Sequence, residues 1–205
     1  MIKNPSEKDE IYLKNVEKIG NSAENIKYVE DVLSKEEHAV LLDYVMNRSL
    51  WILEPWDAYT VGMDQLPTNI LEMLEKIFAV VHKNATDAYG VDINYFQKEN
   101  IALIKFEKGL VLHPHIDTNS AESNHIASIY YINDDYIGGE LCFPELGVNI
   151  KPKPNSLIFF PGNENYLHEV KTIVMGNRYS SSMWFQFTGS NFNKNAEWYN
   201  KNDKS

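Results

Sequence analysis

Several features are scarce in this 205-residue sequence, and each scarcity excludes a class of protein. A single cysteine, Cys142, cannot form a disulfide within the chain, so we expect a protein of a reducing compartment, the cytoplasm. Only ten glycines and eight prolines occur, which argues against long linkers and low-complexity segments. With 43% hydrophobic residues, a chain of this length can bury a core unaided, so we expect one domain.

Long hydrophobic runs and basic runs are also missing. The apolar runs Ile77–Val81 and Leu157–Phe160 are far shorter than the roughly 20 residues of a membrane-spanning helix, and the first residues lack the apolar stretch of a secretory signal. The formal net charge of −10 would repel a phosphate backbone. We therefore expect neither a membrane nor a nucleic-acid partner, and a basic peptide or protein fits the charge better. The sequence leaves the oligomeric state open.

Patterning divides the chain into three parts. Residues 1–25 and 189–205 are polar, and a single domain should span residues 26–188. Two helices are expected in a buttress of about residues 34–90. One begins at Ser34, which can form a capping box with Glu37, and the other runs from Thr68 to a stop at Gly90.

Short β segments separated by turns follow in a core of about residues 100–187. The expected strands are Ile101–Phe106, Ile126–Ile132, Glu140–Phe143, Leu157–Phe160, His168–Val174 and Arg178–Phe187. Helices followed by many short strands indicate an α+β fold, in which the helices pack on a sheet sandwich or open barrel.

One short segment concentrates residue types that bind metals. His115 and Asp117 are two residues apart and would share one face of an extended backbone. With one more histidine they could form the 2-His-1-carboxylate facial triad of non-haem Fe(II) oxygenases. Taken alone, a His-x-Asp triplet is more often a surface turn, and His113 is also two residues from His115.

His168 is the best candidate for a third ligand. It begins an expected strand in which His168, Val170 and Thr172 share an inward face. An inward imidazole is costly unless a partner satisfies it, and a metal ion is one such partner. His38 and His82 fall on the expected helices among charged neighbours, where we expect both to be solvated.

The expected strand Arg178–Phe187 has two different faces. One face is apolar and typical of a core, with Tyr179, Met183, Phe185 and Phe187. The other face carries Arg178, Ser180, Ser182, Trp184 and Gln186. This pattern suits a barrel whose interior is a binding pocket. An inward arginine needs an anion, which could be a ligand carboxylate or a glutamate within the fold.

Five motifs follow one another in the order of a known enzyme family. They are His115-Ile116-Asp117, Ile129-Tyr130-Tyr131-Ile132-Asn133, Gly138-Gly139-Glu140-Leu141 with Phe143-Pro144, Phe159-Phe160-Pro161 leading to His168-Glu169-Val170, and Gly176-Asn177-Arg178-Tyr179 with Trp184. Over about residues 100–187 the chain resembles the Fe(II)/2-oxoglutarate-dependent dioxygenases, and within them the prolyl 4-hydroxylases of the hypoxia-factor, bacterial and viral types.

This resemblance implies a double-stranded β-helix, a jelly-roll or cupin-like barrel, with the N-terminal helices packed on its major sheet. The implied catalytic residues and Fe(II) ligands are His115, Asp117 and His168. The implied ligands of the far carboxylate of the co-substrate 2-oxoglutarate are Arg178 and Tyr131.

The resemblance also implies an activity and a substrate pocket. The activity is O2-dependent hydroxylation of a prolyl residue in a peptide or protein, with release of succinate and CO2, and ascorbate is a candidate additional cofactor. Trp184 would line the substrate pocket. Two other functions stay open: hydroxylation of another side chain, a small molecule or a nucleobase, and metal binding without turnover by a cupin-like module. The net charge disfavours a nucleobase, and Arg178 disfavours a simple cupin, which needs no anion clamp there.

The chain departs from the family pattern in two regions. Hypoxia-factor prolyl hydroxylases have a tyrosine on the strand before the His-x-Asp motif, whereas this chain has Ile104-Lys105-Phe106, and it stays open whether Lys105 replaces the hydroxyl. The region Leu50–Gln65 matches no feature of the family that we can name. Its first part, Leu50–Trp56, could cover a substrate or cap the helical layer with its two tryptophans.

Overall fold

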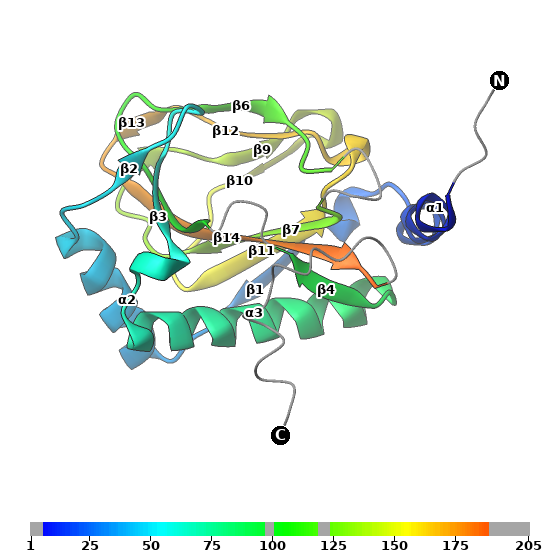
Figure 1. The fold of residues 1–205 in the computed structure, drawn as a ribbon. Coiled ribbons are helices and arrows are strands. Elements are labelled where there is room, and N and C mark those ends of the chain that lie inside the picture. The colour runs from blue at the N-terminus through cyan, green and yellow to red at the C-terminus, as the bar shows by residue number, and fades with distance from the viewer. Residues whose placement is uncertain (1–5, 97–100, 119–123, 189–205) are drawn as a thin grey trace.

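Two antiparallel sheets facing each other form the centre of the computed structural model, which describes residues 6–96, 101–118 and 124–188 (Figure 1). Within these residues the larger sheet has eight strands, in the order β1 (Lys27–Glu30), β11 (Ser156–Pro161), β7 (Ile126–Tyr131), β14 (Arg178–Phe187), β5 (Ile101–Phe106), β3 (Tyr59–Gly62) and β2 (Ile52–Leu53), with β4 (Ile93–Phe96) paired to β14. The smaller sheet has the order β10 (Val148–Ile150), β9 (Leu141–Phe143), β12 (His168–Val170) and β6 (Leu112–His115). A further pair joins β13 (Ile173–Met175) and β8 (Ile137–Gly138).

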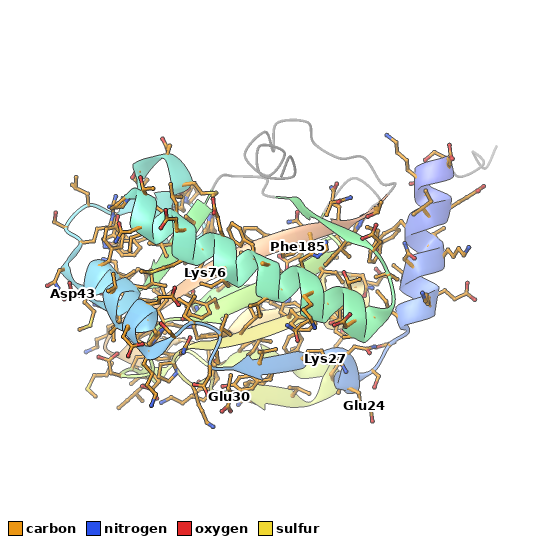
Figure 2. All side chains as sticks on the ribbon, turned by 90° about the horizontal axis from the view of Figure 1, so that it is seen from below. Glu24, Lys27, Glu30, Asp43, Lys76 and Phe185 are labelled. Atoms are coloured by element: carbon orange, nitrogen blue, oxygen red, sulfur yellow. The ribbon has the colours of Figure 1, made fainter. Side chains whose placement is uncertain are left out.

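Helices cover the outer face of the larger sheet. Figure 2 shows α3 (Thr68–Tyr89) running across this face with α2 (Lys35–Asn47) beside it and α1 (Glu7–Ile19) near one end. The two predicted helices are present, because Ser34 and Glu37 form the expected capping box of α2, and Gly90 ends α3 in the left-handed region at φ 62°. The predicted α+β class, with helices packed on the major sheet, is therefore confirmed.

The N-terminal segment adds a helix where we expected only a polar segment. Ser6 caps α1, and a capping box with Asp9 satisfies the first backbone N–H groups of the helix. Tyr12 is the one residue of α1 that becomes buried, and its ring lies 4.9 Å from that of His125. No helix within the described ranges combines the length and the hydropathy required to cross a bilayer.

The strand β14 separates two cores. Its apolar face, including Phe185 labelled in Figure 2, packs in the cluster that α3 covers. Its other face looks between the two sheets, where Arg178, Ser180, Ser182 and Trp184 line a cavity. The predicted alternation of this strand is confirmed for both faces, except that Gln186 does not reach the cavity.

The predicted strand His168–Val174 is two strands. β12 pairs with β6 and β9 in the smaller sheet, whereas β13 pairs with β8. The chain breaks between them because Lys171 N–H donates to the carbonyl of Glu140, and Gly139 N–H donates to that of Thr172. Thr172 is exposed, so our expectation that it shares the inward face of His168 was wrong.

The region Leu50–Gln65 forms the edge of the larger sheet through β2, β3 and the short helix η2 (Met63–Gln65). Its two tryptophans pack in different places, one in the helical layer and one at the cavity between the sheets. Trp51 packs 5.8 Å from the ring of Tyr179 in the helical layer, as one of our two alternatives proposed. Trp56 instead packs 6.1 Å from the ring of Phe106 and lines the cavity between the sheets, as the other alternative requires.

Asn155 connects the helical layer to the larger sheet. It adopts φ 57°, a conformation that asparagine tolerates better than most residues, and its amide bonds both the N–H and the carbonyl of Leu33 at 2.9 and 2.8 Å. Its Oδ1 also accepts from the hydroxyl of Tyr130 at 2.9 Å. The same hydroxyl is 2.8 Å from Nδ1 of His38 on α2.

We predict that Asn155→Ala lowers the free energy of unfolding by about 2–4 kcal/mol, because it leaves buried polar groups of Leu33 and Tyr130 without their partner. Urea denaturation measures this change. Asn47→Ala is the matched control, because the amide of Asn47 bonds only Asp43 on the exposed side of α2. Equal stabilities of the two variants would contradict the role of Asn155.

Candidate metal centre and anion site

A cavity of about 360 Å³ lies between the two sheets. Its walls are mostly apolar, and its polar lining groups are few. The lining residues are Trp56, Ile104, Phe106, Leu112, His115, Asp117, Ala127, Ser128, Ile129, His168, Val170, Arg178, Ser180, Ser182 and Trp184. An apolar cavity with a few convergent polar groups is the usual form of a small-molecule site. The three predicted metal ligands and the predicted anion ligand Arg178 therefore share one cavity.

His115, Asp117 and His168 come together at this cavity. One ligand atom from each lies within 4.8 Å of the others. The cause is the antiparallel pairing of β6 with β12, which places His168 directly opposite His115, with ring centroids 4.2 Å apart. Asp117 lies in a bend just after β6, and its Oδ2 is 3.5 Å from Nε2 of His168.

Each of the three side chains is held by a hydrogen bond at the polar atom that is not its ligand atom. Nδ1 of His115 lies 2.9 Å from the carbonyl of His113, and Nδ1 of His168 lies 3.0 Å from the carbonyl of Tyr166. A proton on Nδ1 leaves Nε2 as a free acceptor in both rings. Trp184 Nε1 donates to Oδ1 of Asp117 at 3.1 Å, which leaves Oδ2 available.

The backbone fixes Asp117 without a strand. The N–H groups of Asp117 and Thr118 both donate to the carbonyl of Gly162, at 3.0 and 2.7 Å. A Cβ at Gly162 would lie 3.0 Å from Cβ of Asp117 and 3.1 Å from the carbonyl oxygen of Asn124, so a side chain at this position would press these segments apart. Asp117 thus lies in a bend and not in the extended backbone that we expected, and the bend still places its carboxylate beside His115 and His168.

The surroundings keep His168 neutral. Burial lowers the pKa of His168, and the carboxylate of Asp117 opposes this effect only in part. The rings of Phe160 and Phe143 lie 4.7 and 5.7 Å from the imidazole. Two imidazole nitrogens and one carboxylate oxygen match the donor set of a non-haem Fe(II) site, so the residues fit this metal.

Arg178 lies in the same cavity and is 1% exposed. Its guanidinium carbon is 4.8 Å from the ring centroid of Tyr131 and 5.4 Å from that of Phe106, and Nη1 donates to Oγ of Ser180 at 3.3 Å. In the described part of the chain, Nε and Nη2 have no hydrogen-bond partner and no carboxylate forms an ion pair with Arg178. The alternative of an Arg–Glu pair inside the fold thus has no support in these residues, and the geometry fits an anionic ligand.

The other histidines and Lys105 lie away from the cavity. His38 and His82 are partly buried, bonded to the Tyr130 hydroxyl and the Ile93 carbonyl, so our expectation of solvated side chains was wrong. Lys105 points to the opposite face of β5, where Nζ is 2.7 Å from Oε1 of Glu107 and 4.5 Å from the centroid of the Tyr59 ring. Lys105 therefore does not replace the tyrosine hydroxyl that the family has on this strand and that this chain lacks.

The sequence left two roles open for Trp56, covering a substrate or capping the helical layer, because the strand pairing that brings β2 and β3 to the edge of the sheet is long-range. It gave no role to Tyr136, whose buried hydroxyl has no hydrogen-bond partner among the described residues.

Comparison with known proteins agrees with this geometry. Residues 101–186 match the family model of the 2OG-Fe(II) oxygenase superfamily. These residues are therefore similar to a 2OG-Fe(II) oxygenase domain. The solved structure of the viral collagen prolyl hydroxylase from Paramecium Bursaria Chlorella virus-1, in complex with 2OG, is similar, with a TM-score of 0.63 at 19% identity, covering 80% of this chain and 96% of that one.

Two further relatives belong to the same group. A Trichoplax adhaerens prolyl hydroxylase, solved with a peptide fragment of the hypoxia inducible factor oxygen degradation domain, has a TM-score of 0.63 at 16% identity and covers 87% of this chain and 90% of that one. The chicken prolyl 4-hydroxylase subunit alpha-1 is 24% identical over 132 residues, which are 56% of this chain and 25% of that protein. This chain therefore matches about a quarter of its curated relative. The predicted resemblance and the predicted double-stranded β-helix are confirmed.

We predict that Trp184→Phe weakens binding of Mn(II), used in place of Fe(II), by about 10- to 100-fold, because Asp117 loses the hydrogen bond that orients its carboxylate. Isothermal titration calorimetry measures the affinity. Trp51→Phe is the control, since Trp51 Nε1 donates to the carbonyl of Arg48 in the helical layer. Unchanged affinity in Trp184→Phe would show that this hydrogen bond does not organise the site.

Proposed function

We propose that this chain is an Fe(II)- and 2-oxoglutarate-dependent dioxygenase that hydroxylates a prolyl residue in a peptide or protein. The observation that carries the proposal is one apolar cavity that joins a His-Asp-His group to a buried arginine, which pairs with no carboxylate among the described residues. The family match and the prolyl hydroxylases among the structural relatives support it. The products besides the hydroxylated peptide are succinate and CO2.

The metal site would use Nε2 of His115, Nε2 of His168 and Oδ2 of Asp117. When bound, iron supplies the oxygen chemistry of this superfamily, in which oxidative decarboxylation of 2-oxoglutarate drives hydroxylation of a C–H bond. The protein holds the three ligands in place through the carbonyls of His113 and Tyr166 and through Trp184. This prior ordering removes most of the rearrangement that binding would otherwise require.

Arg178 would bind the far carboxylate of 2-oxoglutarate. Its two unpartnered nitrogens, Nε and Nη2, form one edge of the guanidinium fork and match the two oxygens of a carboxylate. Tyr131 stands beside it with a buried hydroxyl, and burial raises the pKa of Tyr131 to about 12, so this hydroxyl is a donor at neutral pH.

The walls of the cavity limit water near the reacting groups. Ile104, Ile129 and Val170 line the cavity, and Leu141 is buried in the cluster behind it. Excluding water strengthens the interactions of Asp117 and Arg178 with charged ligands, and it limits side reactions.

The substrate would enter beside Trp56 and Trp184, which are both partly exposed and line the cavity. Flat aromatic side chains suit a prolyl ring because they bury apolar area at low entropic cost. The net charge of −10 favours a peptide that carries basic residues over a nucleic acid.

Mass spectrometry of a proline-peptide library tests this proposal. The protein is incubated with Fe(II), 2-oxoglutarate and ascorbate, and a peptide should gain one oxygen on proline in step with succinate formation. Gain of an oxygen on another residue, or turnover of a small molecule alone, would show that the enzyme catalyses the same reaction on a substrate other than proline. Succinate that never forms under any condition would favour a binding module without turnover.

Variants of the site test the roles of its residues. We predict that His115→Ala, Asp117→Ala and His168→Ala each abolish succinate formation, because each removes one ligand of the metal. Full succinate production by His168→Ala would show that the ligand assignment is wrong.

We predict that Arg178→Ala raises the KM for 2-oxoglutarate by about 100-fold, because the variant loses a charge-assisted, two-pronged hydrogen bond to the co-substrate. Initial rates of succinate formation over a range of 2-oxoglutarate concentrations give this value. Arg48→Ala is the matched control, since Arg48 bonds Tyr44 and Leu50 far from the cavity lining and should keep the wild-type KM. A wild-type KM in Arg178→Ala would remove Arg178 from the co-substrate site.

A further inference from the structure

Four buried hydrogen-bonding atoms gather around Arg178 without partners. They are Nε and Nη2 of Arg178, the hydroxyl of Tyr131 and the hydroxyl of Tyr136, and none has a hydrogen-bond partner in the described part of the chain. Leaving such groups buried and unsatisfied destabilises a fold, so several of them at one place indicate a site built for a ligand. Sequence motifs assigned a role to Arg178 and Tyr131, whereas Tyr136 lies in the turn between β7 and β8 and had none.

Tyr136 is close to Arg178 through the paired glycines of the next segment. A Cβ placed on Gly139 would lie 3.0 Å from Cε2 of Tyr136 and 3.3 Å from Cδ of Arg178, so the phenol ring and the arginine stem flank the same glycine. The Arg178 guanidinium lowers the pKa of both Tyr131 and Tyr136 through its charge and through weak side-chain hydrogen bonding, against the larger upward effect of burial, although neither hydroxyl reaches the geometry of a full hydrogen bond. Both hydroxyls are therefore within electrostatic range of the guanidinium and keep their protons at neutral pH.

The backbone holds Tyr136 in a fixed position. A Cβ on Gly176, at φ 80°, would lie 3.1 Å from Cα of Tyr136, so the β13–β14 turn packs directly against this residue. The Nζ of Lys151 donates to the carbonyl of Tyr136 at 3.0 Å. Tyr136 itself is 2% exposed and packs with Phe106 and Ile173. A rigid, dry and unpartnered hydroxyl suits a binding residue better than a purely structural one.

We propose that Tyr136 is a third ligand of the far carboxylate of 2-oxoglutarate, beside Arg178 and Tyr131. The inference rests on the proposed function and names a further residue of its co-substrate site. A carboxylate offers about four lone-pair positions on its two oxygens. The two guanidinium N–H groups and the two phenol O–H groups supply four donors, so one carboxylate can satisfy all four orphaned groups.

Calorimetric binding to the Mn(II)-loaded protein, without oxygen and without turnover, tests the inference. Tyr136→Phe should weaken binding of 2-oxoglutarate by about tenfold or more, as expected for loss of a hydrogen bond to a charged group. It should leave binding of 2-oxopentanoate unchanged, because this acid has the same chain length but no far carboxylate. The melting temperature of the ligand-free variant should not fall, since the substitution removes a hydroxyl that has no protein partner there.

Tyr179→Phe is the matched control, because Tyr179 is also a buried tyrosine of this region but faces the helical layer, where its hydroxyl accepts from Asn177. It should bind 2-oxoglutarate as the wild type does. If Tyr131→Phe weakens binding and Tyr136→Phe does not, or if Tyr136→Phe weakens both oxo acids equally, the inference is overturned while the proposed function stands. If the wild-type protein binds Mn(II) but not 2-oxoglutarate, the inference fails together with the proposed function.

Discussion

The antiparallel register between β6 and β12 places His168 directly opposite His115. Most of the site depends on this pairing, because it brings together ligands that are 53 positions apart in the chain. A slip of one residue would turn His168 away from the cavity, since alternate side chains in a strand point to opposite faces. The carbonyls of His113 and Tyr166 then fix the two rings, and the bend at Asp117, bonded to Gly162, adds the carboxylate.

The strand β14 connects the metal site to the anion site. Trp184 bonds Asp117 near one end of the strand, and Arg178 begins its other end. The opposite face of β14 packs under α3, so the apolar core that stabilises the fold also holds both groups in position. The proposed co-substrate, with an oxo acid at one end and a carboxylate at the other, matches this arrangement.

Local patterns predicted the parts of the fold that local physics controls. The capping box at Ser34, the stop at Gly90 and the two-faced strand Arg178–Phe187 depend on neighbouring residues, and the structure has each of them. The break after Val170 and the bend at Asp117 were not predicted, because both depend on backbone hydrogen bonds to distant segments, Glu140 and Gly162.

The residues of the candidate site also fall into those that the sequence predicted and those that depend on long-range packing. Motif order identified His115, Asp117, His168 and Arg178 as one group, and the structure brings them to one cavity. Tyr136 gave no local signal, since it reaches Arg178 only through the packing of two glycine turns. Local patterns left two roles open for Trp56, and only the pairing of the edge strands decides between them. Whether Lys105 replaces the missing tyrosine hydroxyl could be decided only from the structure, which places it on the face of β5 away from the cavity.

Visible absorption in the absence of oxygen tests the central claim most directly, because it requires the metal and the co-substrate to bind at the same place. Addition of 2-oxoglutarate to the Fe(II)-loaded protein should produce a weak visible band that neither component gives alone. The band should be absent from Asp117→Ala, which lacks the carboxylate ligand. A wild-type protein without the band, or an Asp117→Ala protein with an equal one, would contradict the account.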